Sequence, residues 1–464
     1  MRRSISPLSA ILLASVSTFG LSQALAAPAA SDPSKKPPAP QAQAQAESTG
    51  GTESEKVTVT ARRSRENVQD VPGSVSAFSE KSLDRLGATD ATGVQGAIPN
   101  MNIVQGRGSS NATNIYIRGV GQPDALQTFD PAVGVYVDDV YLSRIRGTQF
   151  ELLDIERLEV LRGPQGTLYG KNTIGGALKV ITRRPTQDFN GVASLTAGSY
   201  NELTGNVVLS GGLAEDVAGS IALLRTTRDG YVTNPVTGAE YNDRDALAGR
   251  VKLAWDAGKD VTVDVSLDYA KEDNALVLGK ATNTISTILG APLVPVVPPG
   301  PEFTFNATPT PGLPNSTKMT HWGGSVNVGW DVTQNLSIKS ITAYRKLQNE
   351  DFIDIDATPV EVGDVFVGVD QKQISQEVLA TYEDGALKIV GGVFAMKETV
   401  GSHQEAYSDD FVIGFLGATG FLRTVDDDLD TTSLAAFANA SFALTKDLNL
   451  SAGVRFTAEE KDYF

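Results

Sequence analysis

Residues that could carry out covalent or metal chemistry are scarce in this chain of 464 residues. It contains no cysteine, and its two histidines, His321 and His403, lie far apart in the sequence. Thiol catalysis and metal sites built on thiolates are therefore excluded. Two isolated histidines are too few for a histidine-based metal site or a catalytic triad. We expect a protein that is not an enzyme and that holds no metal and no cofactor.

Two glycine-rich stretches resemble nucleotide-binding motifs but depart from them. In 166–172, the motif glycine lies four positions before Gly170 instead of five, and Asn172 follows Lys171 where a P-loop has Ser or Thr. The stretch 106–111 begins like a dinucleotide fingerprint, but it lacks the third glycine and the strand-to-helix setting. Tight turns account for these glycines.

The charge balance limits the kinds of molecule that the chain could bind. The chain has 55 acidic and 39 basic residues, a formal net charge of −16, and 41% of its residues are hydrophobic. Such a hydrophobic content is too high for a disordered chain, and an acidic chain is a poor match for nucleic acid. We expect a folded protein that binds no nucleic acid.

The N-terminus is typical of an exported protein. Arg2 and Arg3 precede an apolar run over 8–21, which ends near an Ala-Leu-Ala sequence. This pattern predicts a secretory signal peptide over 1–26, and the run is short for the alternative, an uncleaved membrane anchor. Residues 27–54 are rich in Pro, Ala, Gln and Ser, so they cannot bury enough apolar surface to fold and are expected to form a flexible tether.

A short β-prone strip over 55–61 follows the tether. It could be an ordinary first strand, or it could add itself to the sheet edge of a partner through backbone hydrogen bonds. The residues that would make these bonds are Glu55, Lys56, Val57, Thr58, Val59 and Thr60.

From about residue 190 the sequence alternates between apolar and polar residues. The clearest example is 261–269, where Val, Leu and Tyr alternate with Thr, Asp and Ser. This period predicts strands of about ten residues with one apolar face, which would point inward in a soluble sandwich and outward in a membrane barrel. About eleven strands are expected, near 190–199, 203–212, 217–228, 244–256, 260–272, 321–331, 335–347, 366–383, 386–399, 431–445 and 447–460.

The lengths of the connections favour the membrane barrel. Short turns are expected at one end of the strands, at 256–260, 331–335, 383–386 and 445–447, and long loops at the other end, at 229–243, 272–320 and 400–430. Short turns on one side and long loops on the other are typical of outer-membrane barrels, whereas a soluble sandwich has no reason to separate them.

The stretch 62–187 is organised differently, with short predicted elements and many glycines. A helix is expected over 79–86, and strands are expected over 114–119 and 133–140; the run 155–164 then leads through the glycine-rich stretch 166–170 into 175–182. These elements predict a small α+β domain ahead of the strand-rich part.

This middle stretch resembles the plug domain of TonB-dependent outer-membrane receptors. The resemblance is carried by IYIRGVG at 115–121, VGVYVDDVYL at 133–142 and the long run DIERLEVLRGPQGTLYGKNTIGGALKVITRRP at 154–185. It implies a mixed fold, in which a small α+β plug over 62–187 precedes an antiparallel transmembrane β-barrel. About 11 of the family's 22 strands fit into 188–464, so a C-terminally truncated chain is expected.

The resemblance also implies a function. The strip at 55–61 resembles the TonB box, which would pair with TonB, itself energised by ExbB and ExbD in the inner membrane. The expected function is energy-coupled uptake of a ferric siderophore through the outer membrane of a Gram-negative bacterium, by a monomer embedded in outer-membrane lipid. An oligosaccharide, cobalamin or heme is the alternative cargo, and a passive porin or an exported binding or adhesin protein is the alternative class.

The resemblance finally assigns residues on the plug. Arg118 and Arg162 are expected to latch the plug to glutamates of the barrel wall, for which no position is named; solvent-facing surface arginines are the alternative. The expected ligand-binding residues, on outward loops of the plug, are Gln105, Arg107, Ser109, Asn111, Gln122 and Asp124.

Overall fold

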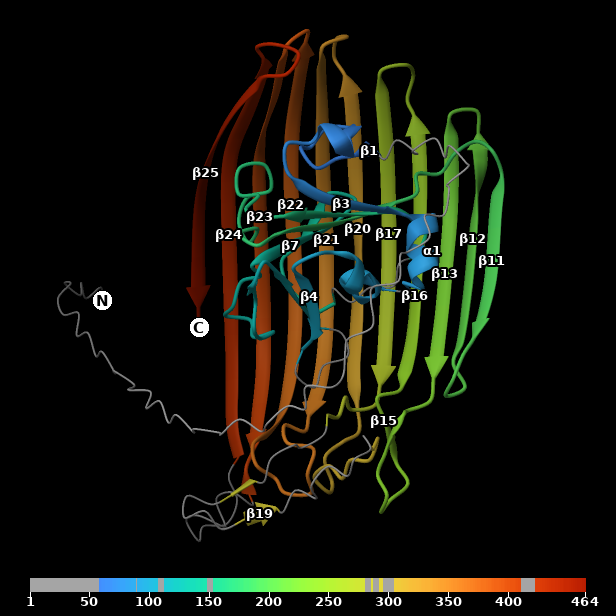
Figure 1. Cartoon of the computed structure of the whole chain (residues 1–464), viewed down its shortest axis with the longest axis vertical. Helices are drawn as coiled ribbons and strands as arrows, with labels where there is room; N and C mark the ends of the chain where they lie inside the picture. The colour runs from blue at the N-terminus through green and yellow to red at the C-terminus, as the bar shows by residue number, and fades with distance from the viewer. Residues whose placement is uncertain are drawn as a thin grey trace, which may run out of the picture. The chain divides into compact units, whose positions relative to one another are not determined.

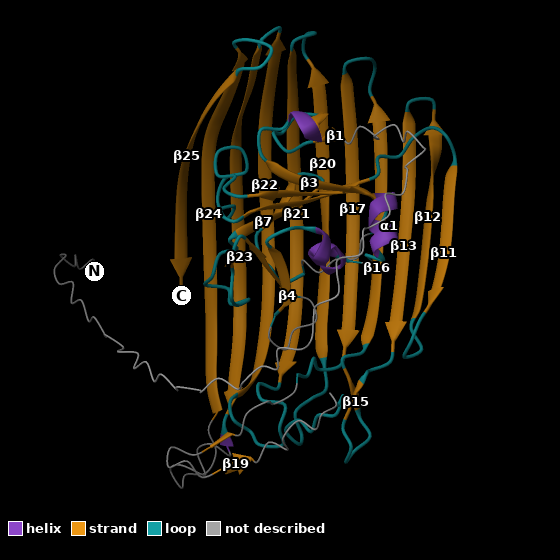
Figure 2. Cartoon of the chain, in the orientation of Figure 1, coloured by secondary structure: helices purple, strands orange, loops and turns teal. Residues whose placement is uncertain are grey.

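The computed structural model describes the chain in eight stretches: residues 58–88, 90–106, 112–147, 153–279, 285–286, 292–294, 304–409 and 422–464. These stretches form a small α+β domain followed by a large antiparallel sheet (Figures 1 and 2). The predicted signal peptide, the predicted tether and residues 55–57 of the strip lie outside the described residues. Among the helices of the described stretches, none is long and apolar enough to cross a membrane.

The small domain is built around a five-stranded sheet in the order β3-β9-β10-β7-β8. Strand β10 runs parallel to β7 and antiparallel to β9, which in turn pairs with β3. The strands of this sheet are β3 (Ser74–Ser79), β7 (Val133–Val137), β8 (Val140–Leu142), β9 (Ile155–Arg162) and β10 (Gly176–Thr182). The strand predicted over 114–119 is present at Thr113–Ile117, and the strand predicted over 133–140 is divided by a turn into β7 and β8.

Shorter elements complete the small domain. The predicted helix is α1 (Glu80–Leu86), and it ends where Gly87 adopts the left-handed conformation, with φ of 63°, that a helix C-cap favours. The other elements are β1 (Thr58–Val59), β2 (Glu66–Asn67), the 3-10 helices η1 (Val68–Asp70) and η2 (Ala91–Ala97), and the three-stranded sheet β4 (Met101–Gln105), β5 (Thr113–Ile117) and β6 (Val120–Gly121). Leu158 and Leu178 are fully buried in the core between these layers.

The large sheet contains eleven long strands that follow one another in chain order, from β11 at one edge to β25 at the other (Figure 1). All neighbouring strands are antiparallel. They are β11 (Asn190–Ala197), β12 (Leu203–Ala214), β13 (Val217–Arg228), β16 (Arg244–Asp256), β17 (Val261–Asn274), β20 (Thr317–Asp331), β21 (Leu336–Ile353), β22 (Asp364–Asp384), β23 (Leu387–Tyr407), β24 (Leu422–Ala443) and β25 (Asn449–Tyr463). The predicted number and order of strands and the predicted short turns are confirmed.

The two faces of the large sheet differ as the alternation predicts. One face carries the residues that contact the small domain, and the opposite face, called the outer face below, carries an apolar band. On β20 the band is bordered by Trp330 near the short turns and by Trp322 farther along the strand. These two residues are separated by about 26 Å at about 3.3 Å per residue, which matches the apolar band of about 25 Å on membrane barrels.

The strands extend beyond this band on the side of the long loops. Strands β21 to β24 have between 18 and 22 residues, well above the expected ten or so. Strand β24 begins at Leu422 instead of near 431, so the loop expected over 400–430 is shorter than predicted. The acidic residues Asp426, Asp427 and Asp428, which fall within that expected loop, consequently lie in β24.

The long connections build a small hydrophobic cluster of their own. The hairpin of β14 (Val232–Thr233) and β15 (Glu240–Tyr241) packs against Leu276 and Leu278. Tyr231 lies edge-on to Phe305, with ring centroids 5.7 Å apart. These aromatic side chains therefore pack within the loops. The remaining two-residue and three-residue strands are β18 (Ile285–Ser286) and β19 (Pro292–Val294).

Candidate functional site

The end of the predicted TonB box is held by a charged pair inside the small domain. The backbone N–H of Thr60 donates to both carboxylate oxygens of Glu159, at 2.9 and 3.1 Å. Lys179 Nζ donates to the hydroxyl of Thr60 at 2.6 Å and to its carbonyl oxygen at 3.2 Å. The Tyr169 hydroxyl donates to the same carbonyl oxygen at 3.1 Å. Every polar group of Thr60 is therefore engaged, and we call this set the Thr60 clamp.

The sheet of the small domain creates the Thr60 clamp. Glu159 and Lys179 are directly opposite each other on β9 and β10, so both side chains emerge on the same face. Both are almost fully buried. Because a buried charge without a partner costs several kcal/mol, each is held in place by the groups that it bonds. Thr58 and Val59 pair with Asn67 and Glu66 across the β1–β2 hairpin.

A second group of charges joins the clamp to the large sheet. Lys179 Nζ lies 3.1 Å from Asp139, which also pairs with Lys339 of β21 at 2.7 Å. Arg63 lies 3.5 Å from Asp139 and 3.3 Å from Glu377 of β22. Burial alone would raise the pKa of Asp139, but the three cations outweigh it and hold that pKa well below its usual value.

Arg63 is also fixed by aromatic rings. Its guanidinium lies 4.4 Å from the ring centroid of Tyr169 and 5.6 Å from that of Tyr136. A guanidinium over an aromatic face gains about 0.5–2 kcal/mol, more when it is desolvated. The residue three positions after the clamp is thus tied to the small domain and to the wall at once.

A third set of contacts lies toward the long-loop end of the sheet. Glu398 of β23 accepts hydrogen bonds from Ser143 at 2.5 Å, from Arg144 Nε at 2.9 Å and Nη2 at 2.7 Å, and from Gln371 at 2.9 Å. Arg146 forms an ion pair with Asp351 of β21, and Asp351 is fully buried. These pairs anchor the small domain to the sheet.

The predicted latch arginines lie elsewhere. Arg118 is exposed, has φ of 55° and forms no ion pair with any residue in the described stretches. Arg162 is half-buried and donates to the carbonyl oxygen of Pro99 at 3.3 Å. Neither touches a wall carboxylate in the described part of the sheet, so their role as a latch stays a prediction. In this part of the chain, Arg63, Arg144 and Arg146 link the two domains.

The predicted ligand-binding residues are only partly described. Arg107, Ser109 and Asn111 lie outside the described residues. Gln105 lines a cavity of about 190 Å³ together with side chains of the barrel strands and loops: Arg228, Tyr231, Asn242, Asp243, Arg244, Glu272, Asn274 and Val277. In this cavity Arg228 and Arg244 are balanced by the carboxylates of Asp243 and Glu272, so the cavity that Gln105 lines is polar and carries no excess charge.

The other two predicted ligand residues form a local turn. Gln122 is buried, and its side-chain amide donates to the carbonyl oxygen of the half-buried Asp124. The side-chain oxygen of Gln122 has no hydrogen-bond partner in the described stretches. The structure therefore brings Gln122 and Asp124 together but does not place them in the cavity that Gln105 lines.

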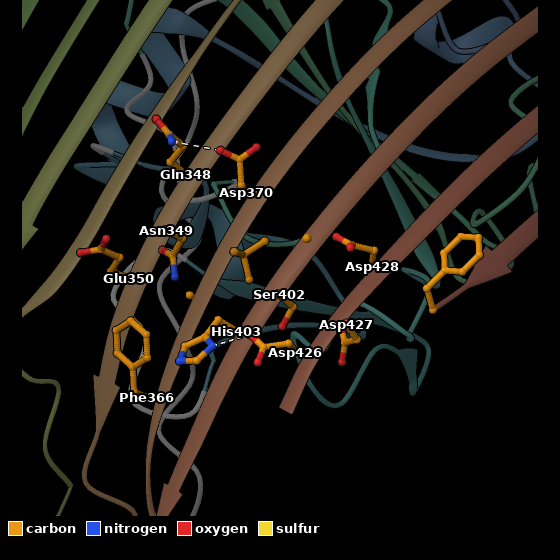
Figure 3. A pocket seen from close by; sticks show the side chains of 14 residues that line it. Gln348, Asn349, Glu350, Phe366, Asp370, Ser402, His403, Asp426, Asp427 and Asp428 are labelled. Carbon is orange, nitrogen blue, oxygen red and sulfur yellow. Dashed lines mark hydrogen bonds and ion pairs between the residues drawn. The ribbon is translucent and has the colours of Figure 1, made fainter. Parts of the chain in front are cut away.

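A larger cavity, of about 610 Å³, lies mainly on the outer face and not on the side of the small domain (Figure 3). In it His403 bonds Asp426 at 2.6 Å, and Gln348 donates to Asp370 at 3.0 Å. Within the described stretches, no group of three or more His, Asp or Glu side chains could hold a metal ion. The cavity is therefore an acidic hollow on the outer face.

Sequence reasoning missed the Thr60 clamp and both charge groups. A signal for the clamp was available in β10, where Lys179 is the only charged residue. Glu159 gave a weaker signal, because Arg157 lies on the same face of β9 and donates to it at 2.8 Å. The partners of Arg144 and Arg146 offered no such signal. Glu398 and Asp351 are far away in sequence and alternate with other polar residues of the same strands.

Comparisons with known proteins agree with this architecture. Residues 67–177 match the model of the TonB-dependent receptor plug domain. The pesticin receptor of Yersinia pestis is 32% identical over 203 residues, which are 43% of this chain and 30% of that protein. The vitamin B12 transporter BtuB of Photobacterium profundum is 32% identical over 179 residues, 38% of this chain and 28% of that protein.

Solved structures cover more of the chain. The ferric yersiniabactin uptake receptor FyuA from Yersinia pestis superposes with a TM-score of 0.71 at 22% identity, over 84% of this chain and 57% of that one. The ferripyoverdine receptor of Pseudomonas aeruginosa superposes with a TM-score of 0.68 at 17% identity, over 88% and 55%. The chain thus spans about a third of the sequence relatives that it matches and a little over half of these solved receptors.

Proposed function

Since this chain belongs to the TonB-dependent receptor family, we propose that it takes part in the energy-coupled uptake of a scarce ligand, most simply a ferric siderophore. Its location is the outer membrane of a Gram-negative bacterium. The family is one of transport receptors, and the chain would perform no covalent step. TonB, with ExbB and ExbD, would supply the energy, and the working unit would be a monomer in outer-membrane lipid.

The observation that carries this proposal is the Thr60 clamp at the end of the strip. A partner strand paired with residues 55–59 would pull on the next backbone group, which is Thr60. The pull would act directly on Glu159 and Lys179 and, through Asp139, on Lys339 of the sheet. A pull on the strip would thereby weaken the contacts that hold the small domain against the large sheet.

The proposed function also assigns a role to each segment of the chain. We propose a signal peptide over 1–26, a periplasmic tether over 27–54, the TonB box over 55–61, the plug over 62–187 and the N-terminal part of the barrel over 188–464. Strand addition suits residues 55–60, because it uses backbone groups and tolerates varied side chains.

The choice of a siderophore rests on the relatives. The cavity beside Gln105 is polar, because it is lined by Arg228 and Arg244 as well as by Asp243 and Glu272, and Tyr231 supplies an aromatic face. Two of the solved relatives are receptors for ferric siderophores by name. A relative that carries vitamin B12 keeps cobalamin as the second candidate.

The test removes the strip, including Thr60, and surface binding of the ligand reports whether the rest of the receptor stays folded without the contacts of Thr60 to Glu159 and Lys179. In cells that carry the gene, deletion of residues 55–61 is expected to abolish uptake of radioactive iron from ferric siderophores while surface binding of the complex persists. A matched control deletes seven residues of the tether, 40–46, and should keep both. Uptake that survives deletion of 55–61 would refute the proposal, and loss of surface binding would show that the strip has another role.

A further inference from the structure

The small domain is bound unevenly to the large sheet. Every strand from β21 to β25 forms an ion pair or a hydrogen bond with it, through Lys339, Glu377, Glu398, Asp427 and Glu459. By contrast, none of the hydrogen bonds and ion pairs within the described stretches joins residues 58–186 to β11, β12 or β13, which lie at one edge of the sheet (Figure 1). The small domain can therefore separate from these three strands without breaking a polar contact.

The face that β11, β12 and β13 turn toward the small domain is uncharged along most of its length. The cavity beside α1 and the register between the strands identify this face. We call it the neutral wall, and its residues are Asn190, Val192, Ser194, Thr196, Thr204, Asn206, Val208, Ser210, Ala218, Ser220, Ala222, Leu224 and Thr226. Because no buried charge loses its partner when this wall is uncovered, separation costs less here than at the ion pairs of the other strands.

Two cavities lie along the neutral wall, one toward each end of its strands. The first is the polar cavity of about 190 Å³ beside Gln105, which reaches β13 at Arg228. The second, of about 110 Å³, lies between α1 and the strands β11 and β12, where Asn206 and Ser210 line it. The side-chain oxygen of Asn206 is buried and has no hydrogen-bond partner in the described stretches. A polar molecule that moves along the wall would therefore find space at both levels.

Leu153 of the small domain lies between these two cavities. Its side chain is 2% exposed and packs against Ala222 and Leu224 of the neutral wall. Leu224 is four positions from Arg228 of the first cavity, which is about 13 Å at about 3.3 Å per residue. Ala222 is directly opposite Val208, which lines the second cavity. The leucine side chain thus closes the path from one cavity to the other.

The contacts of Leu153 allow it to move. Within the described stretches, its only polar contact with the sheet is a hydrogen bond, at 2.6 Å, that Arg250 of β16 donates to its carbonyl oxygen. Arg250 is directly opposite Asp268 of β17, so its charge keeps a carboxylate beside it if this bond breaks. Displacement of Leu153 would therefore cost apolar contacts and one hydrogen bond, and would leave no charge without a partner.

We propose that Leu153 is the gate of a passage that the ligand takes between the small domain and the neutral wall. This inference rests on the proposed function and names the route that uptake would follow. A pull that loosens the small domain at the strip would move Leu153 off Ala222 and join the two cavities. The bonds to β21–β25 would meanwhile keep the other side of the domain in place. The wall of the passage would offer hydroxyl and amide groups, which bind a polar ligand without holding it by charge.

The first test compares two alanines of the sheet that the small domain covers. Ala222→Cys lies under the gate, and the matched control Ala343→Cys lies on β21, in the cluster that joins this strand to the small domain. In cells that carry the gene and are supplied with ferric siderophores, a small polar maleimide should label residue 222 at least tenfold faster when TonB is present than when it is deleted. The same comparison at residue 343 should differ by less than twofold.

Each other result of this labelling would count against the gate. Equal acceleration at both positions would mean that the small domain leaves the sheet as one body. No acceleration at residue 222 would mean that the neutral wall stays covered. Either result would overturn the proposal.

The second test holds the gate shut. Leu153→Cys together with Ala222→Cys, bridged by a short reducible bis-thiol reagent, should lower uptake of radioactive iron from ferric siderophores at least tenfold while surface binding persists. A reductant should restore uptake, which also reports that the variant folds. The matched control bridges Thr167→Cys to Gly453→Cys on the side of β25, where Cγ2 of Thr167 lies 2.7 Å from the position of a Cβ atom on residue 453. That bridge should change uptake by less than twofold.

The outcomes separate the gate from the proposed function. Uptake that survives the bridge between residues 153 and 222 would overturn the gate, and so would equal loss of uptake with both bridges. If deletion of 55–61 still abolishes uptake in that case, the proposed function stands without the gate. If the variant with two cysteines does not fold, the labelling of the single replacements Ala222→Cys and Ala343→Cys decides.

Discussion

The replacement Glu398→Ala tests how firmly the plug is seated in the wall. Its carboxylate accepts four hydrogen bonds between 2.5 and 2.9 Å, two of them from Arg144 and one from Ser143 on the plug. Both members of the ion pair are at least nine-tenths buried. Loss of the carboxylate would leave the guanidinium of Arg144 in a closed site without a counter-charge.

The magnitude follows from this geometry. Removing one partner of a buried ion pair costs about 3–5 kcal/mol, because the remaining charge is uncompensated. At about 1.4 kcal/mol per tenfold change, the population of plugs detached at this contact should rise by about two to three and a half powers of ten. Glu398→Gln keeps an acceptor and should cost less, about 1.5–3 kcal/mol, the usual value of a hydrogen bond to a charged group.

Because the chain has no native cysteine, alkylation of a single introduced cysteine can measure how often the plug–wall contact opens. A single Ala112→Cys places a thiol at a fully buried position that pairs with Arg146 at the plug–wall contact. Its rate of alkylation reports how often this region opens. The matched control is Glu350→Ala, which removes an exposed carboxylate from the outer face of β21 and should leave the rate unchanged. Equal rates in the Glu398→Ala variant and in the unmodified chain would refute the reasoning.

Two other predictions concern the plug turn and the loops. A methyl group on Gly176, whose φ is 150°, would lie 2.2 Å from a carbonyl oxygen of β9, so Gly176→Ala should reduce the amount of folded receptor in outer membranes, measured by immunoblot. Burial raises the pKa of Asp354 to about 6, so the folded loop favours the protonated form of this side chain. This preference stabilises the loop at pH 4. The stabilisation, at most about 3 kcal/mol, is lost as the pH rises to 6. The protection of residues 304–313 against hydrogen exchange, corrected for the intrinsic pH dependence of amide exchange, should therefore fall between pH 4 and 6. Because burial also raises the pKa of Asp364, the double replacement Asp354→Asn and Asp364→Asn should remove this fall. Unchanged folded protein in the first case, or a pH profile that persists in the second, would contradict these predictions.

The strands were predictable because each one crosses a sheet with two different faces. Between the aromatic borders, the outer face must be apolar, so the alternation is strong in 261–269 and the strand is unmistakable. Beyond the borders, both faces are polar. The alternation therefore disappears at 422–430 although the backbone of β24 continues to pair with β23. The predicted strands were too short for this reason.

The candidate site was harder to predict from the sequence than the strands were. The strip over 55–61 is visible as a local pattern, and a charged residue in a mostly apolar strand, such as Lys179 of β10, signals a buried partner. The identity of that partner depends on which strands meet in space. Arg144 and Glu398 are separated by 254 positions, and nothing local distinguishes Glu398 from the other polar residues of β23.

The arrangement of the charge groups bears on how a pull on the strip could open the receptor. Detaching the whole plug at once would break the pairs of Arg63, Arg144 and Arg146 together, before water could hydrate the separated charges. If opening starts at the strip, only the Thr60 clamp has to break first. Water then reaches Glu159 and lowers the cost of the next step. A stepwise opening that starts at the short-turn end is therefore favoured over ejection of a rigid plug. The thiol at residue 112 distinguishes the two, because it should stay protected while the strip is pulled free if opening is stepwise, and react at the same moment if the plug leaves as one body.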